Sequence, residues 1–228
     1  MDIIETGEFD MPEQMTEQMK EWAGKFGEEY VDRNITSPDE FDNLIRSRIG
    51  FSRTEQIDEF LSDLKLNNIL EVGCNVGNQL LLLQKNGFEN LCGIELNRYA
   101  VEKAKERTKG IDIIQGSAFD IPFKDVYFDL VFTSGVLIHI SPQDINDVLD
   151  EIYRCSKKYI WGSEYFSADY IKVDYRGHNE LLWKTNFAKL YLDRFLDLEL
   201  VKEKKYPYLE DKKLVDQVFL LKKIENRR

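Results

Sequence analysis

Residues 69–78, which read ILEVGCNVGN, constrain the fold of this chain more than any other segment. A short apolar run ends at the carboxylate of Glu71, and a turn containing Gly73 and Gly77 follows. The apolar residues 80–83 then predict a helix. A strand that passes through such a turn into a helix directs backbone N–H groups and the helix N-terminus at a ligand. The segment therefore predicts an α/β fold with a small-molecule site.

A second carboxylate indicates what kind of ligand the turn binds. The apolar run 91–94 ends in Glu95, 22 residues beyond Gly73. A carboxylate about 20 residues past such a turn is placed to accept hydrogen bonds from a ribose. Two glycines spaced four apart do not fit the three-glycine dinucleotide fingerprint, and no lysine follows the turn as in a P-loop. The pattern favours a nucleoside-bearing cofactor other than a dinucleotide or a nucleoside triphosphate.

Four motifs in order resemble those of the class I S-adenosylmethionine-dependent methyltransferases. Residues 71–77 resemble E-x-G-x-G-x-G, with Asn75 in place of the middle glycine. Residues 115–123 resemble the family segment G-D-A-x-x-L-P-F, residues 128–134 its F-D-L-V-x-S strand, and residues 135–140 its V-L-x-H-I motif. The resemblance implies a Rossmann-like α/β fold, with a mostly parallel seven-stranded sheet flanked by helices. It also implies S-adenosylmethionine as the cofactor and no metal.

The resemblance also implies which residues bind that cofactor. Glu71 is expected near the methionyl amino group, and Glu95 can accept from both ribose hydroxyls because a carboxylate has two acceptor oxygens. Tyr30 and Arg33 could reach the cofactor carboxylate, or could serve only in helix packing and a surface ion pair. The complete expected set is Tyr30, Arg33, Glu71, Gly73, Asn75, Gly77, Glu95, Leu96, Ser117, Ala118, Thr133 and Ser134.

The first 66 residues form a helical layer in front of the predicted core. Met15, Met19, Trp22 and Phe26 recur at helical spacing, and apolar residues 41–45 and 57–64 predict two further amphipathic helices. Ser37 before a proline is a plausible helix N-cap. We expect residues 1–66 to act as a lid or cap over a methyltransferase core formed by residues 67–228.

A narrower resemblance concerns the acceptor. Residues 22–34 (WAGKFGEEYVDRN), 175–178 (YRGH) and 182–195 resemble the methylases associated with pseudaminic acid biosynthesis. This resemblance implies a sugar, sugar nucleotide or nonulosonic acid in surface glycan biosynthesis as the acceptor. Two alternatives stay open, namely an inactive S-adenosylmethionine-binding partner in a glycan assembly complex and a carboxyl methyltransferase of an acidic metabolite. Whether the acceptor atom is oxygen or nitrogen also stays open.

The candidate catalytic residues are the two histidines of the chain, His139 and His178. Histidine titrates near neutrality and could remove the acceptor's proton; a structural role in a turn or loop is the alternative for each. An arginine suits a carboxylate or phosphate on the acceptor. The expected acceptor-binding residues are Glu164, Tyr165, Tyr175, Arg176 and Arg194.

The charge composition of the chain disfavours some classes of binding partner. The formal net charge is −11, and residues 1–66 carry −10 of it. An acidic chain without a basic stripe is a poor partner for nucleic acid. No apolar stretch approaches the ~20 residues of a membrane span, and we expect a cytoplasmic protein. Cys74 and Cys92 are expected to be buried reduced thiols. The oligomeric state is left open.

Overall fold

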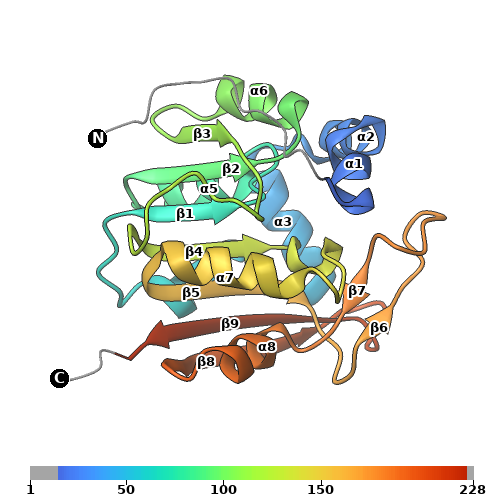
Figure 1. The fold of residues 1–228 in the computed structure, drawn as a ribbon. Helices are drawn as coiled ribbons and strands as arrows, with labels where there is room; N and C mark the ends of the chain where they lie inside the picture. The colour runs from blue at the N-terminus through green and yellow to red at the C-terminus, as the bar shows by residue number, and fades with distance from the viewer. Residues whose placement is uncertain (1–14, 225–228) are drawn as a thin grey trace.

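Seven strands form one sheet in the order β3-β2-β1-β4-β5-β9-β8 (Figure 1). The computed structural model describes residues 15–224. In chain order the strands are β1 (Ile69–Val72), β2 (Leu91–Glu95), β3 (Asp112–Gln115), β4 (Phe128–Ser134), β5 (Ser156–Tyr165), β8 (Leu198–Pro207) and β9 (Val215–Lys223). The first five pair in parallel, β9 is antiparallel to β5, and β8 is antiparallel to β9. The predicted Rossmann-like, mostly parallel sheet is confirmed.

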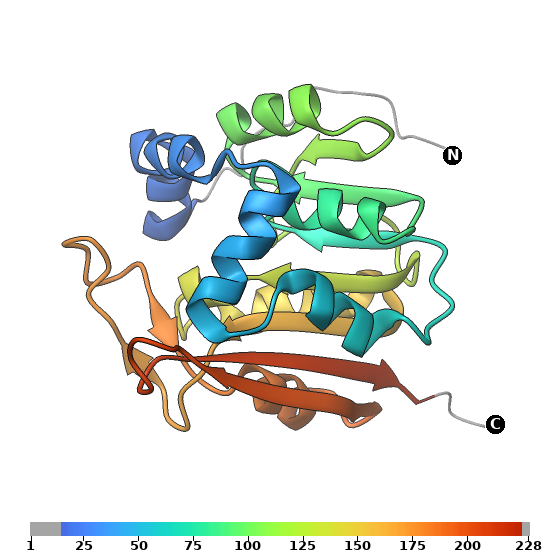
Figure 2. The same cartoon turned by 180° about the vertical axis from the view of Figure 1, so that it is seen from behind.

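Helices cover both faces of the sheet. On one face α7 (Ile145–Cys155) and α8 (Phe187–Arg194) bury apolar side chains against β4 and β5. On the other face lie α3 (Pro38–Ile49), α4 (Arg53–Leu61), α5 (Asn78–Lys85) and α6 (Arg98–Arg107), of which α3 to α5 are in front in Figure 2. The central parallel strands β1, β2 and β4 are therefore buried on both sides, as parallel sheets require.

The predicted N-terminal layer divides into two parts in the structure. α1 (Glu17–Ala23) and α2 (Lys25–Asn34) are separated at Gly24 and lie at the carboxyl ends of the parallel strands (Figure 1). By contrast, α3 and α4 contribute Ile49, Ile57 and Phe60 to the core on the sheet face. The predicted cap at Ser37 is confirmed, since its Oγ accepts from the Glu40 N–H at 3.3 Å. Among residues 15–66, α1 and α2 are the helices that lie at the carboxyl ends of the strands.

Two small elements lie at the same end of the sheet as α1 and α2. The 3₁₀ helix η1 (Leu137–His139) follows β4 directly. Strands β6 (Ile171–Lys172) and β7 (Trp183–Lys184) form a separate antiparallel pair that projects beyond β5 (Figure 1). Ligands of open α/β sheets bind at the carboxyl ends of the strands. These elements therefore surround the expected site.

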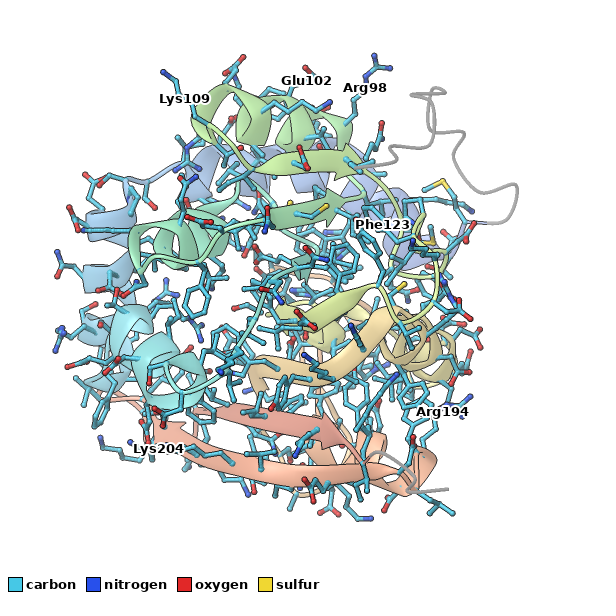
Figure 3. All side chains as sticks on the ribbon, turned by 90° about the vertical axis from the view of Figure 1, so that its left-hand side faces the viewer. Arg98, Glu102, Lys109, Phe123, Arg194 and Lys204 are labelled. Atoms are coloured by element: carbon cyan, nitrogen blue, oxygen red, sulfur yellow. The ribbon has the colours of Figure 1, made fainter. Side chains whose placement is uncertain are left out.

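Charged side chains project from the helices that cover the sheet. Arg98, Glu102 and Lys109 extend outward from α6 and its following turn (Figure 3). Cys74 and Cys92 are buried free thiols, as predicted. Within residues 15–224 we find no helix that combines the length and the apolar character needed to cross a membrane.

Candidate functional site

The turn after β1 has the backbone geometry that the sequence predicts for close approach of a ligand. Gly73, Asn75 and Gly77 have φ angles of 74°, 48° and 78°. A Cβ on Gly73 would lie 2.6 Å from Cγ2 of Val136, so any other residue there would push the turn and the loop after β4 apart. Asparagine enters the left-handed region more readily than most residues, which explains how Asn75 replaces a glycine.

Glu95 holds this turn through its carboxylate. Oε2 accepts from the Asn75 N–H at 2.9 Å, and Oε1 accepts from the Asn97 N–H at 2.8 Å. Burial raises the pKa of Glu95, and the hydrogen bonds from backbone N–H groups partly offset that rise. Each oxygen has a second lone pair free for another donor. Glu95 therefore positions the turn and can still accept two ribose hydroxyls.

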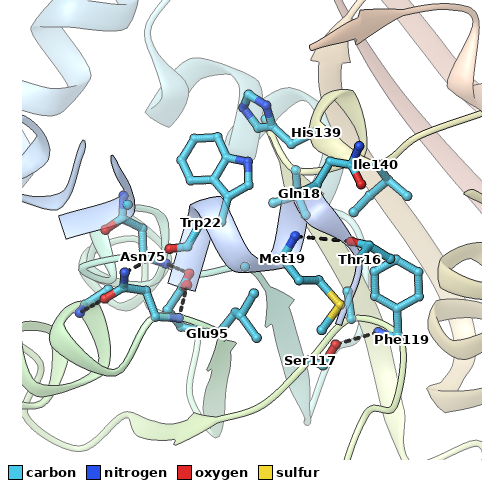
Figure 4. Close-up of a pocket in the computed structure, with 18 of the residues that line it drawn as sticks. Thr16, Gln18, Met19, Trp22, Asn75, Glu95, Ser117, Phe119, His139 and Ile140 are labelled. Carbon is cyan, nitrogen blue, oxygen red and sulfur yellow. Dashed lines mark hydrogen bonds between the residues drawn. The ribbon is translucent and has the colours of Figure 1, made fainter. Parts of the chain in front are cut away.

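A cavity opens between this turn, the end of β4 and helices α1 and α2 (Figure 4). Eight of the residues predicted to bind the cofactor line it: Tyr30, Gly73, Asn75, Glu95, Leu96, Ser117, Ala118 and Ser134. The Oγ of Ser117 accepts from the Phe119 N–H at 3.1 Å, which leaves its own O–H free to donate. The cavity thus combines an apolar region near Leu96 and Ala118 with polar groups at its ends.

Helices α1 and α2 close one side of the cavity through Trp22 and Tyr30. The carbonyl of Trp22 accepts from Asn97 Nδ2 at 2.9 Å. A Cβ on Gly27 would lie 1.9 Å from that carbonyl oxygen, so only glycine permits this packing of α2 against α1. The Tyr99 hydroxyl donates to Asp32 at 2.8 Å. Polar contacts on α6 therefore dock the two helices over the turn.

Behind Ser134 lies a buried polar cluster, in which Glu71 was predicted from the sequence but Arg53, Gln56 and Gln79 were not. Ser134 Oγ accepts from Gln79 Nε2 at 2.9 Å and from Arg53 Nη2 at 3.3 Å. Arg53 is only 4% exposed, and Glu71 is only 2% exposed. Burial raises the pKa of Glu71 well above its ordinary value, and Arg53 lowers it in part.

Several atoms of this cluster have no hydrogen-bond partner among residues 15–224, namely Arg53 Nε, Gln56 Nε2, Glu71 Oε2 and Gln79 Oε1. Buried polar atoms without a partner are costly, and each needs an explanation. An ammonium and a carboxylate at the end of the cavity would supply partners for both signs of charge. The cluster therefore fits the methionyl end of S-adenosylmethionine, with Glu71 for the amino group and Arg53 for the carboxylate.

The sequence contained a signal for Arg53. The buried face of α4 is formed by Arg53, Gln56, Ile57, Phe60 and Leu61. Arg53 lies four residues before Ile57, so the same periodicity that predicts the buried apolar face also includes the arginine. A charged residue at a core position of an amphipathic helix is seldom buried without a functional or pairing reason.

The other four predicted cofactor residues, Glu71 among them, lie outside the cavity lining. Gly77 is the N-cap of α5, and Thr133 is buried at the end of β4 beside Ser134. Arg33 is exposed near the C-terminus of α2. The structure therefore does not bring Arg33 to the cavity, whereas Tyr30, three residues before it, does line it.

An aromatic cluster joins α1 and α2 to the acceptor side. The Trp22 ring lies 4.4 Å from the His139 ring and 5.2 Å from the Tyr30 ring, measured between centroids. The Tyr175 ring lies 5.4 Å from that of His139. The Phe26 ring lies 5.1 Å from that of His178. The cavity and the loop between β6 and β7 therefore share one aromatic wall.

His139 is the histidine that lines the cavity (Figure 4). Its Nδ1 lies 2.6 Å from the Leu181 carbonyl oxygen. A carbonyl only accepts, so Nδ1 carries the hydrogen and Nε2 is the acceptor of the neutral ring. Burial lowers the pKa of His139 to about 4, although the bond to Leu181 opposes this. At neutral pH the ring is therefore uncharged, and Nε2 is available as a hydrogen-bond acceptor.

His178 and Arg176 are farther from the cavity. Both lie in the turn between β6 and β7, where the Tyr175 N–H donates to the His178 carbonyl at 2.9 Å. Arg176 is exposed, with a φ of 55°. Neither residue lines the cavity, while Tyr175 reaches it indirectly through His139.

Arg194 is the last residue of α8 and lies at the outer edge of the molecule (Figure 3). Its Nε donates to Asp150 Oδ1 at 2.6 Å, which joins α8 to α7. The structure therefore separates Arg194 from the other predicted acceptor residues.

Glu164 and Tyr165 end β5 below the loop after β4. The Glu164 carboxylate accepts from the Val136 N–H at 3.3 Å. Burial raises the pKa of Glu164 to about 7, and hydrogen bonds from Thr133 and from the backbone of η1 partly offset the rise. Glu164 thus anchors the turn that carries His139. Tyr165 lies beside Tyr208, with ring centroids 6.2 Å apart.

Comparison with known proteins agrees with this geometry. Residues 70–159 match the family model described as a methyltransferase domain. The 24-methylenesterol C-methyltransferase 2 of Oryza sativa subsp. japonica is 28% identical over 132 residues, which cover 55% of this chain and 35% of that protein. The phosphoethanolamine N-methyltransferase of Plasmodium falciparum (isolate 3D7) is 24% identical over 160 residues, or 68% of this chain and 56% of that protein.

Among solved structures, the [4+2]-cyclase SpnF superposes with a TM-score of 0.60 and 15% identity, over 75% of this chain and 80% of that one. This likeness concerns the fold. The chain spans about a third of the sterol relative and about half of the phosphoethanolamine relative. The domain match and these relatives support an S-adenosylmethionine-dependent methyltransferase, with S-adenosylmethionine as the methyl donor.

Proposed function

We propose that this chain transfers a methyl group from S-adenosylmethionine to a small hydroxylated or amino acceptor, of the sugar, sugar-nucleotide or nonulosonic acid type. The observation that carries the proposal is a cavity lined by Glu95 at one end and by Ser134 at the other, with the buried polar cluster of Arg53 and Glu71 behind Ser134. The acceptor class is supported by the sequence resemblance of residues 22–34, 175–178 and 182–195 to methylases of pseudaminic acid biosynthesis.

The bound cofactor supplies an electrophilic methyl on a sulfonium, and the protein must align an acceptor atom and exclude water. Trp22, Tyr30 and His139 form the wall between the cavity and the loop that joins β6 and β7. In this proposal the acceptor approaches along that wall. His139 accepts a hydrogen bond from the acceptor through Nε2, and its uncharged state keeps a cation away from the methyl group.

The N-terminal part of the chain has a role in the same proposal. We assign the lid function to α1 and α2, within the layer of residues 1–66, because these helices line the cavity and dock on α6 through few polar contacts. Mobile elements that close over a substrate exclude water and complete the site.

Two measurements test the proposal. Calorimetry measures binding of S-adenosylmethionine and of a nicotinamide dinucleotide to the full chain. Release of S-adenosylhomocysteine is then measured with free and nucleotide-linked nonulosonic acids, phosphoethanolamine and a sterol as acceptors. We expect cofactor binding and turnover with a nonulosonic acid. Turnover with the sterol alone would contradict the acceptor class, and tight binding of the dinucleotide instead would contradict the whole proposal.

A further inference from the structure

The turn after β1 and the helices that cover it meet at Val76. Val76 lies between Asn75 and Gly77, whose φ angles are 48° and 78°. Its side chain is buried and forms a small apolar cluster with Val31 of α2 and Ala100 of α6. This cluster is separate from the two larger clusters on the faces of the sheet. Helix α2 therefore packs directly on the turn and on α6.

The side chain of Arg107, the last residue of α6, bonds to the backbone on both sides of this contact. Nη1 donates to the Val76 carbonyl at 2.8 Å, and Nη2 donates to the carbonyl of Thr36, in the link between α2 and α3. Nη2 also donates to Asn78 Oδ1 at 2.9 Å. One guanidinium thus joins the turn, the first residue of α5 and the segment that follows α2.

Asn78 completes the connection to α2. Its Nδ2 donates at 2.9 Å to the carbonyl of Asn34, the last residue of α2. The buried amide of Asn78 thus accepts from Arg107 through Oδ1 and donates to Asn34 through Nδ2, so two partners fix its orientation. The carbonyls of Asn34 and Thr36, at the end of α2, are both held by residues that contact or follow the turn.

The partners of Arg107 indicate a positioning role. They are two backbone carbonyls and one amide oxygen, all of them neutral. A planar guanidinium has five N–H donors in fixed directions and can bridge several acceptors, whereas a lysine has a single nitrogen. Among residues 15–224, those that line the cavity do not include Arg107. Its contacts therefore suit it to hold other segments in place and not to bind the cofactor itself.

We propose that Arg107 is a positioning residue that, together with Asn78, holds the C-terminal end of α2 to the cofactor turn and so stabilises α1 and α2 in their closed position. This inference rests on the proposed function, in which α1 and α2 are a lid. Glu95 accepts from the Asn75 N–H of the same turn, so a ribose on Glu95 and the lid both depend on one backbone conformation. When fewer molecules have the lid in place, the apparent affinity for the cofactor falls by the same fraction.

Amide hydrogen exchange and calorimetry on the full chain test the inference. The proteins are the wild type, Arg107→Met, Arg107→Lys and Lys105→Met. Lys105 is the matched control, because it is the other basic residue in the last turn of α6 and is exposed. Exchange is followed in α1 and α2 and, for comparison, in β1 and β4. The probe is S-adenosylhomocysteine, whose Kd is measured by calorimetry.

We expect exchange in α1 and α2 to be at least tenfold faster in Arg107→Met than in the wild type, with exchange in β1 and β4 unchanged. The Kd for S-adenosylhomocysteine should rise about tenfold, since the hydrogen bonds that are lost involve a charged group. Arg107→Lys should resemble Arg107→Met, because one ammonium cannot bridge three separate acceptors in the same way. Lys105→Met should stay within twofold of the wild type in both measurements.

Three results would overturn the inference. The first is that Arg107→Met equals Lys105→Met in exchange and in Kd. The second is that exchange in β1 and β4 rises as much as in α1 and α2, which would give Arg107 a general role in stability. The third is wild-type behaviour of Arg107→Lys, which would mean that charge alone matters. A wild type that binds no S-adenosylhomocysteine contradicts the proposed function, whereas binding that does not depend on Arg107 contradicts only this inference.

Discussion

Substitution of Glu95 tests the cofactor site most directly, because each of its two carboxylate oxygens accepts from a different backbone N–H and has a lone pair left for a ribose hydroxyl. One oxygen accepts from the Asn75 N–H at 2.9 Å and the other from the Asn97 N–H at 2.8 Å. Ribose hydroxyls would use the remaining lone pairs. Glu95→Ala removes both sets of acceptors. Loss of hydrogen bonds to a charged group costs about 1.5–3 kcal/mol, or roughly 10- to 150-fold in Kd for S-adenosylmethionine.

The substitution Glu95→Gln removes the charge of the side chain but keeps its size and shape. A glutamine has one acceptor oxygen, so its NH2 group must face one of the two backbone N–H donors. The turn at Asn75 or the start of α6 at Asn97 then loses its acceptor. We expect about a tenfold rise in Kd with little change in thermal stability, because removal of a buried charge offsets part of the lost hydrogen bonding. Burial raises the pKa of Glu95, which indicates that the charge is costly before the cofactor binds.

The assay is isothermal titration calorimetry with S-adenosylmethionine and S-adenosylhomocysteine, accompanied by thermal unfolding. Glu102→Gln is the matched control, since Glu102 is an exposed residue of α6 (Figure 3). Unchanged affinity in Glu95→Ala would refute the assignment of the ribose to Glu95. If Glu102→Gln weakened cofactor binding as much as Glu95→Ala does, the loss could not be assigned to the site at Glu95.

Three further predictions concern the lid, the methionyl end and the loop after β4. Deletion of residues 1–36 should leave a folded core that binds S-adenosylmethionine at least tenfold more weakly by calorimetry; equal affinity would make α1 and α2 only a packing surface. Arg53→Met should lower cofactor affinity by about tenfold or more in the same assay while adenosine affinity stays unchanged, and a parallel loss of both would contradict a contact to the methionyl carboxylate. Burial raises the pKa of Glu164 from 4.5 to about 7, so the native state binds more protons than the unfolded state between these values. Its contribution to stability is therefore present at low pH and lost as the pH rises through about 7, by up to about 3 kcal/mol. Denaturant unfolding at pH 5 and pH 8 should show this loss in the wild type but not in Glu164→Gln, and parallel pH profiles would contradict it.

The strand–turn–helix segment and the carboxylate at the end of β2 could be predicted because each depends on the order of residues within one short segment. The run from β1 through Gly73 and Gly77 into α5, and the carboxylate of Glu95 at the end of β2, each depend on local periodicity and spacing. The same is true of Ser37 before Pro38, which caps α3. Features of this kind can be predicted from the local sequence without knowledge of tertiary contacts.

The acceptor side depends on contacts between distant segments, and there the sequence was less informative. Arg176 and Arg194 both appeared suited to an anion, yet the pairing of Arg194 with Asp150 is set by how α8 packs on α7. The periodicity of α4 marks Arg53 as a buried charge, but its contact with Ser134 depends on how α4 packs against the end of β4. His139 is uncharged because the surrounding elements bury it, which no local pattern reveals.

The position of α1 and α2 has a consequence for the order of events in a catalytic cycle. These helices contact α6 through Trp22 and Asn97 on one side, and the loop between β6 and β7 through Phe26 and His178 on the other. The helices must therefore close over the donor before the wall beside the acceptor is complete. We expect steady-state kinetics with a compulsory order, in which the donor enters first and its demethylated product leaves last.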